Sequence, residues 1–222
     1  YKRQAKVMCG LTLEELGFTS EVQPPYFSVK APVFPYSKFP EAVPQLGPEM
    51  RSTGEVMGVD KDLGFAFLKA YTAAGMSLPK HGRILLTVKS ADKRHIVAEA
   101  RLLESLGYEL LGTQGTWNAL TKHGVQVTRV NKVHQGRPHI VDMIKNREID
   151  LVLNTPYGKQ ERRDDSSIRA AATSAGIPCV TTLPGIRAVV GALAAMHRGD
   201  FEVKSLQEHH ELLAPQRVTA SA

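Results

Sequence analysis

The residues best suited to chemistry in this 222-residue chain lie between Thr87 and Thr116. Its pattern predicts two strands, each followed by a junction that leads into a helix. Residues 90–93 (SADK) follow the first strand, and residues 113–116 (TQGT) follow the second. Small and hydroxyl residues at strand-to-helix junctions are how a doubly wound sheet binds phosphate, because the amides of the helix start are free to donate. Lys93 is expected in the first helical turn, where the helix dipole disfavours a cation unless an anion binds it. The pattern therefore predicts a phosphate-binding edge.

The composition favours small anionic ligands over nucleic acid. The formal charge is +6, but the charges are spread along the chain and aromatic residues make up 6% of it. Basic tracts and stacking platforms are therefore not expected, and neither is nucleic acid as a partner. The two cysteines, Cys9 and Cys179, cannot form a disulfide framework, which indicates a reducing, cytoplasmic setting. No apolar run predicts a membrane span.

From residue 81 onward the pattern alternates between strands and helices, which predicts five βα units. Such alternation indicates an α/β fold with a five-stranded parallel sheet, doubly wound and covered on both faces. The expected strands cover residues 83–89, 108–113, 125–130, 150–154 and 178–181. The expected helices cover residues 92–106, 116–123, 137–145, 164–175 and 186–197, with a further exposed helix over 203–213.

The first 76 residues predict less regular structure. We expect a helix over 1–17, a strand over 26–34 that its prolines confine to an edge, and a helix over 63–74. The Pro- and Gly-rich residues 35–60 show little periodicity. One edge strand and two helices cannot bury a core of their own, so this part is expected to belong to something larger. The chain as a whole is interpreted as a piece of a longer protein.

Open parallel sheets bind ligands at the carboxyl ends of their strands. The polar and small residues expected there are Thr87, Lys93, Thr113, Gly115, Thr116, Lys132, Asn154, Thr155, Gly158, Thr181 and Thr182. Two lysines, several hydroxyls and free helix amides suit a phosphate and a ribose. For any single Ser or Thr, capping of a helix is the commoner role, so the prediction depends on their convergence at one edge.

Three segments carry a resemblance to a known family. Residues 47–58 (GPEMRSTGEVMG) are the most specific, followed by 131–134 (NKVH) with 136–140 (GRPHI), and by 154–156 (NTP) with Asp164 and 168–169 (IR). In this order they resemble the carbamoyl-phosphate synthase large subunit, in its C-terminal portion. The resemblance covers essentially the whole chain.

The resemblance implies two parts. Residues 1–76 resemble the tail of the second ATP-grasp half, and residues 77–222 resemble the methylglyoxal-synthase-like allosteric domain, which binds UMP and IMP in bacterial members. The family's phosphate-binding lysine corresponds to Lys93, and its hydroxyl at the first strand to Thr87. Further effector-binding positions correspond to Thr113, Thr116, Lys132, Asn154, Thr155 and Asp164, and the strand-end pattern adds Thr181.

For the whole protein, the resemblance implies an ATP-dependent ligase with Mg or Mn. It makes carbamoyl phosphate from bicarbonate and glutamine-derived ammonia, for pyrimidine and arginine biosynthesis. Its partners would be a glutamine amidotransferase small subunit and the rest of the large subunit, within an oligomer. This chain would be inactive alone, with no catalytic residue, metal site or cofactor of its own.

Two departures from the family pattern bear on regulation. Members that respond to ornithine carry a carboxylate where this chain has Ala31, and a Tyr-Asp pair where it has Cys179 and Val180. A cationic ligand needs a carboxylate to offset its desolvation, so ornithine control is expected to be weak or absent.

Two alternative functions remain open from the sequence. A stand-alone lyase of the methylglyoxal synthase type needs an acid as proton carrier, but the fourth-strand position is Asn154, leaving Asp92 and Asp164. The other alternative is a purely structural oligomerisation domain.

Overall fold

A computed structural model describes residues 2–21, 23–33, 54–155 and 158–211, with backbone only for residues 158–165 and 210. The chain forms two compact units, which are considered separately. One comprises Tyr1–Tyr26 and Lys204–Ala222, and the other comprises Phe27–Val203.

The smaller unit contains two short helices, α1 (Lys2–Met8) and α8 (Leu206–Glu211). The predicted helix over 1–17 is too long, because Gly10 adopts φ +98° and its amide bonds back to the Val7 carbonyl, which ends the helix. The predicted helix over 203–213 begins only at Leu206. Its start is fixed by a capping box, in which the Ser205 hydroxyl accepts from the Glu208 amide at 3.2 Å and the Glu208 carboxylate accepts from the Ser205 amide at 2.6 Å.

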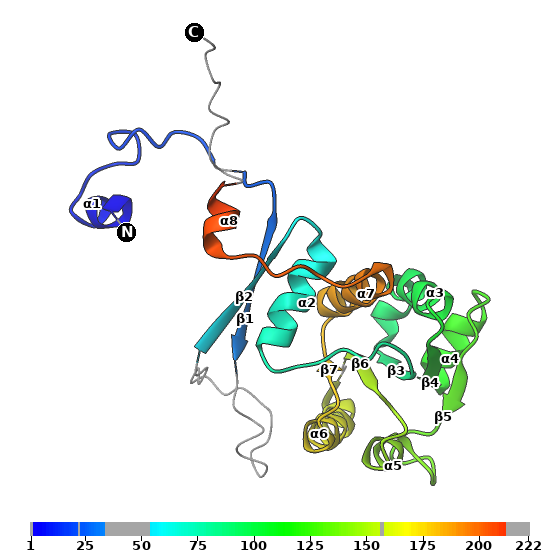
Figure 1. Ribbon diagram of the computed structural model, residues 1–222. Coiled ribbons are helices and arrows are strands. Elements are labelled where there is room, and N and C mark those ends of the chain that lie inside the picture. Colours follow the sequence, from blue (N-terminus) through cyan, green and yellow to red (C-terminus); the bar gives the residue numbers. More distant parts are fainter. Residues whose placement is uncertain (1, 22, 34–53, 156–157, 212–222) are drawn as a thin grey trace. The chain divides into compact units, whose positions relative to one another are not determined.

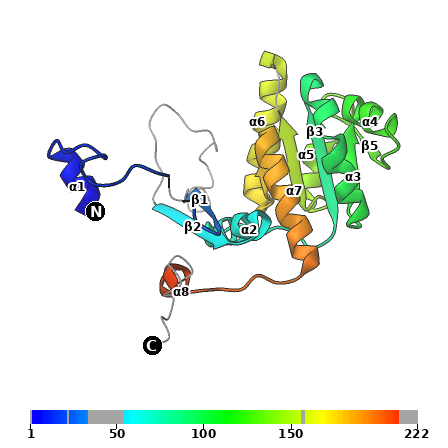
Figure 2. The same cartoon turned by 90° about the horizontal axis from the view of Figure 1, so that it is seen from above.

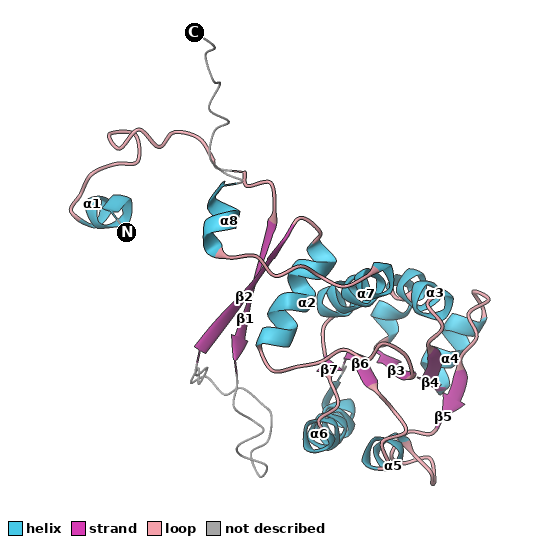
Figure 3. Ribbon diagram, viewed as in Figure 1, coloured by secondary structure: helices cyan, strands magenta, loops and turns pink. Residues whose placement is uncertain are grey.

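The larger unit is built on a five-stranded parallel sheet, with strand order β5-β4-β3-β6-β7 (Figure 3). The strands are β3 (Arg83–Val88), β4 (Glu109–Thr113), β5 (Thr128–Val130), β6 (Leu151–Thr155) and β7 (Cys179–Val180). The predicted α/β fold with its parallel doubly wound sheet is thus confirmed. The two edge strands, β5 and β7, are shorter than the sequence indicated.

Helices cover both faces of this sheet (Figure 1). On β3, Ile84 and Leu86 enter one core, together with residues of α3 (Val97–Ser105), α4 (Gln114–Thr121) and α7 (Leu183–Arg198). Leu85, between them in sequence, enters a second core with residues of α5 (Ile140–Lys145) and α6 (Gly158–Ala175). Side chains alternate between faces along a strand, so a nearly continuous apolar run fills both layers.

A second, two-stranded sheet precedes the first. Strand β1 (Phe27–Val33) confirms the predicted edge strand and pairs antiparallel with β2 (Gly54–Asp60). The sequence pattern predicts no strand over 54–60, because the glycines there disfavour extended structure. Gly58 is required by packing: a Cβ on it would collide with the carbonyl of Ala66 in α2 (Leu63–Ala73). Residues 34–53 of the predicted irregular segment lie outside the described structure.

Helix α2 lies against α7 (Figure 2). Gly64 allows the close approach, since a Cβ there would lie 2.6 Å from the Gly191 carbonyl oxygen. Asp62 caps α2 by accepting from the Gly64 amide at 2.8 Å, and its other carboxylate oxygen accepts from Arg198, at the end of α7, at 2.6 Å. Residues 27–203 therefore pack as one unit. The division of the chain into two domains between residues 76 and 77 stays a prediction.

Candidate functional site

Three predicted site residues form a row at the carboxyl end of the sheet. Thr87 and Asn154 are direct partners on β3 and β6, and Thr113 on β4 follows Gly112, which pairs with Leu86. Adjacent strands lie about 4.8 Å apart, so the row spans roughly 10 Å. The pairing register thus brings together residues that are 67 positions apart in the chain, as the strand-end pattern predicted.

Polar side chains at this end of the sheet are buried. Thr113, Thr116, Asn154 and Thr155 are each 1–4% exposed. Burial of a polar group is costly unless the group has a hydrogen-bond partner. The Thr116 hydroxyl accepts from the Val88 amide at 3.3 Å, and the Thr155 hydroxyl accepts from the Lys89 amide at 3.0 Å. Both threonines therefore hold the end of β3 in place, and a hydroxyl that accepts still has its proton to donate.

The Thr116 hydroxyl can be tested for this structural role. Thr116→Val keeps the side-chain volume but leaves the buried Val88 amide without its acceptor, so a loss of about 2 kcal/mol in unfolding free energy is expected. Thr116→Ser keeps the acceptor and should lose less. Urea unfolding of both variants measures the difference, and equal stability of the serine and valine variants would rule out the proposed anchoring.

A cation faces the start of helix α4. Thr113 occupies the N-cap position of this helix, but its side chain makes no capping hydrogen bond. The Lys93 ammonium lies over the first turn, so close that a Cβ on Gly115 would be 2.7 Å from Nζ. First-turn amides have no partner within their own helix, and together with an ammonium they provide what a phosphate needs. The geometry therefore fits an oxyanion between Lys93 and α4.

The expected position of Lys93 at a helix start is wrong. Lys93 lies in the last turn of the 3₁₀-helix η2 (Ser90–His95), and α3 begins only at Val97. A cation at that end agrees with the helix dipole, so the dipole gives no argument for an anion. Lys93 is half-buried and donates to the Ser90 hydroxyl at 3.3 Å. What favours an anion is instead the position of Lys93 over the first turn of α4.

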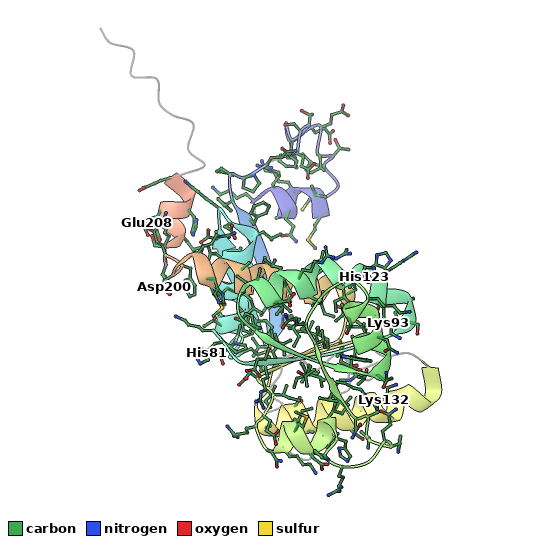
Figure 4. All side chains as sticks on the ribbon, turned by 90° about the vertical axis from the view of Figure 1, so that its right-hand side faces the viewer. His81, Lys93, His123, Lys132, Asp200 and Glu208 are labelled. Atoms are coloured by element: carbon green, nitrogen blue, oxygen red, sulfur yellow. The ribbon has the colours of Figure 1, made fainter. Side chains whose placement is uncertain are left out.

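The structure ties the remaining predicted residues less closely to the site at Lys93 and the start of α4. Lys132 is half-buried and lies two residues after Val130, the partner of Thr113 on β5. In Figure 4, Lys93 and Lys132 lie toward the same edge of the molecule. Thr181 directly follows β7 and is half-buried. Asp164 has its backbone in α6, but its side chain lies outside the described structure.

The prediction from sequence missed a hollow of about 580 Å³ between η2 and α4. Its lining residues are Ser90, Ala91, Lys93, Arg94, Gly115, Asn118, Ala119, Lys122 and His123. Of the predicted effector-binding residues, Lys93 lines it, whereas the row of Thr87, Thr113 and Asn154 does not. A signal was present in the sequence, because residues 115, 118, 119 and 122 have the spacing of one helix face.

Other candidate groups show little sign of chemistry. Burial raises the pKa of the Cys179 thiol to about 11, against the opposing charge of Arg169, which fits a small apolar residue. Ala31 is paired with Val56 on β2, and the expected weakness of ornithine control stays a prediction. Within the described residues, no three His, Cys, Asp or Glu side chains gather as a metal site. None of the described helices is long and apolar enough to cross a membrane.

Several known proteins are similar to this chain. The MGS-like domain family matches residues 95–181. The carbamoyl phosphate synthase large chain of Methanosarcina acetivorans is 46% identical over 95% of this chain and 20% of its own length. That of Gemmatimonas aurantiaca is 47% identical over 98% of this chain and 20% of its own length. A crystal structure of methylglyoxal synthase from Elizabethkingia anophelis aligns with TM-score 0.41 and 21% identity, covering 51% of this chain and 79% of that one.

The chain thus spans about a fifth of the length of these curated relatives, while nearly all of it is matched by them. The residues matched by the MGS-like domain family, 95–181, lie within the part of the chain that forms the parallel sheet and its covering helices. The chain therefore belongs to the carbamoyl phosphate synthase large-chain family and corresponds to a C-terminal part of it that includes the MGS-like domain.

Proposed function

We propose that this chain is a regulatory part of a carbamoyl phosphate synthase large chain and binds a nucleoside monophosphate such as UMP or IMP. The observation that carries the proposal is the Lys93 ammonium over the uncapped start of α4. The row of Thr87, Thr113 and Asn154 at the same end of the sheet, in which Thr113 and Asn154 are buried, supports it.

The proposed binding mode follows from the chemistry of these groups. The phosphate accepts hydrogen bonds from Lys93 and from the first amides of α4, with the Thr116 hydroxyl available as a further donor. Asn154 offers both a donor and an acceptor, which suits the edge of a base or a ribose. Lys132, Thr155, Asp164 and Thr181 complete the proposed effector site.

The activity of the whole protein is proposed from the names of its relatives. We expect ATP-dependent synthesis of carbamoyl phosphate with ammonia from a glutamine amidotransferase small subunit, serving pyrimidine and arginine biosynthesis. ATP and Mg or Mn are implied for that reaction. The chain alone is expected to make no carbamoyl phosphate.

Helix α7 is the proposed link between the effector site and the rest of the enzyme. It begins next to Thr181, with Thr182 capping its first turn, and ends at Arg198, which is paired with Asp62 at the start of α2. A ligand that favours one position of α7 would therefore favour one position of α2 and of the β1–β2 sheet. Such a population shift needs only a difference in ligand affinity between two arrangements.

A thermal titration tests the proposed function. Saturating UMP or IMP should raise the melting temperature, because a ligand that binds only the folded state stabilises it by about 2.7 kcal/mol at 100 times its Kd. Dihydroxyacetone phosphate should not be turned over, since the Asn154 amide cannot act as a base. Turnover would instead favour a lyase, and no stabilisation by either nucleotide would favour a purely structural domain.

A further inference from the structure

The hollow between η2 and α4 is a trough with a regular construction. One wall is the face of α4 made by Gly115, Asn118, Ala119 and Lys122, and the other is the segment 90–94 of η2. Gly115 and Ala119 leave space open between the two walls, because neither carries side-chain atoms beyond Cβ. From Gly115 to Lys122 the α4 wall rises by seven steps of about 1.5 Å, which makes the trough about 10 Å long.

The trough is lined by cationic and neutral polar groups. Lys93 stands at the end beside Gly115, Arg94 lies on the η2 side, and Lys122 and His123 lie at the far end of α4. None of the described lining residues carries a carboxylate; the nearby Asp92 is paired with Lys89 at 3.7 Å. In Figure 4, Lys93 and His123 lie along one edge of the domain. The field in the trough therefore favours an extended anion.

The far end of the trough is held in shape by hydrogen bonds. His123 Nδ1 lies 2.8 Å from the Ala119 carbonyl oxygen, and Arg101 donates to the His123 carbonyl at 2.8 Å. Arg94 uses its Nε to contact the His95 ring at 2.9 Å, and its terminal nitrogens carry further N–H donors. Arg94 and Lys122 are both exposed, so neither has been desolvated before a ligand arrives.

We propose that this trough is a second anionic subsite that continues from the phosphate position at Lys93. It takes the further phosphoryl groups of a nucleoside di- or triphosphate, whose first phosphate lies between Lys93 and the start of α4. Arg94 and Lys122 are the groups that bind the added charge. The inference rests on the proposed nucleotide function and extends it from monophosphates to polyphosphates.

Calorimetric titration of the chain with UMP and with UDP, in metal-free buffer, tests the subsite. UDP is expected to bind roughly tenfold more tightly than UMP, the factor of one added charge-assisted hydrogen bond. In the double variant Arg94→Gln/Lys122→Gln the preference should disappear, while the affinity for UMP stays within about twofold. The control Lys145→Gln removes one exposed charge at the end of α5, on the opposite face of the sheet, and should keep the preference.

The outcomes separate the subsite from the function on which it rests. UMP binding without a preference for UDP overturns the subsite alone, as does a preference that survives in a double variant with wild-type melting temperature. Failure of UMP, UDP and IMP alike to bind overturns the proposed function, and the subsite with it. If the double variant is unfolded, Arg94→Gln and Lys122→Gln are titrated singly, and each should reduce the preference.

Discussion

Replacement of Lys93 by alanine is expected to weaken the binding of UMP or IMP by about 10- to 100-fold while leaving the fold intact. A hydrogen bond between an ammonium and a phosphate is worth about 1.5–3 kcal/mol, and the variant removes the cation that faces the start of α4. The folded chain relies little on this side chain, whose one hydrogen bond among the described contacts goes to the Ser90 hydroxyl at 3.3 Å. Unfolding free energy should therefore change by no more than about 0.5 kcal/mol.

Calorimetry and urea unfolding measure the two quantities independently. Lys145→Ala is the matched control, since it removes the same charge from an exposed position at the end of α5. Nucleotide affinity that is unchanged in Lys93→Ala would show that the phosphate binds elsewhere. A large loss of stability would show instead that Lys93 is a structural residue.

Gly58→Ala is expected to have the largest effect on stability. Gly58 lies in β2 against α2, and an added Cβ would collide with the backbone carbonyl of Ala66 and lie 2.5 Å from the Ala70 amide nitrogen. Backbone atoms of a helix cannot move aside as a flexible side chain can. The strand and helix must therefore separate, at an expected cost of about 3 kcal/mol. Thermal unfolding should show a melting temperature lower by about 6–12 °C.

The same strand provides the control for this substitution. Gly54 is exposed, and a Cβ added there meets no atom within 4 Å, so Gly54→Ala should change stability by less than about 0.5 kcal/mol. Equal melting temperatures for the two variants would contradict the close packing of β2 on α2. Because α2 also packs on α7, Gly58→Ala is a way to loosen the proposed link without touching the effector site.

Much of the architecture could be predicted because its signals are local. The alternation of apolar strands with amphipathic helices indicated a parallel sheet covered on both faces, and the apolar runs within 83–89 and 150–154 indicated two of its strands, which are β3 and β6. Once the strands are parallel, their carboxyl ends share an edge. The convergence of Thr87, Thr113 and Asn154 then follows from the fold class alone.

Features that depend on neighbouring elements could not be predicted. β2 is a strand despite its glycines, because β1 pairs with it and α2 requires the small residue at position 58. Lys93 precedes α3 in a separate 3₁₀-helix, and the boundary between the two depends on how the segment packs. The trough beside α4 needs η2 to lie opposite the face of Gly115 and Ala119, which no local pattern specifies.

By itself, the sequence determined the alternation of five strands with helices from residue 81 onward and the residues at the strand ends, since hydrophobic periodicity and turn residues are properties of short segments. It also carried the resemblance to the carbamoyl phosphate synthase large chain. Only the tertiary structure decided that Lys93 faces α4 across Gly115 and that basic groups from η2 and α4 line one trough. Distances between side chains on different elements are set by the packing of whole layers, and that packing is a property of the complete fold.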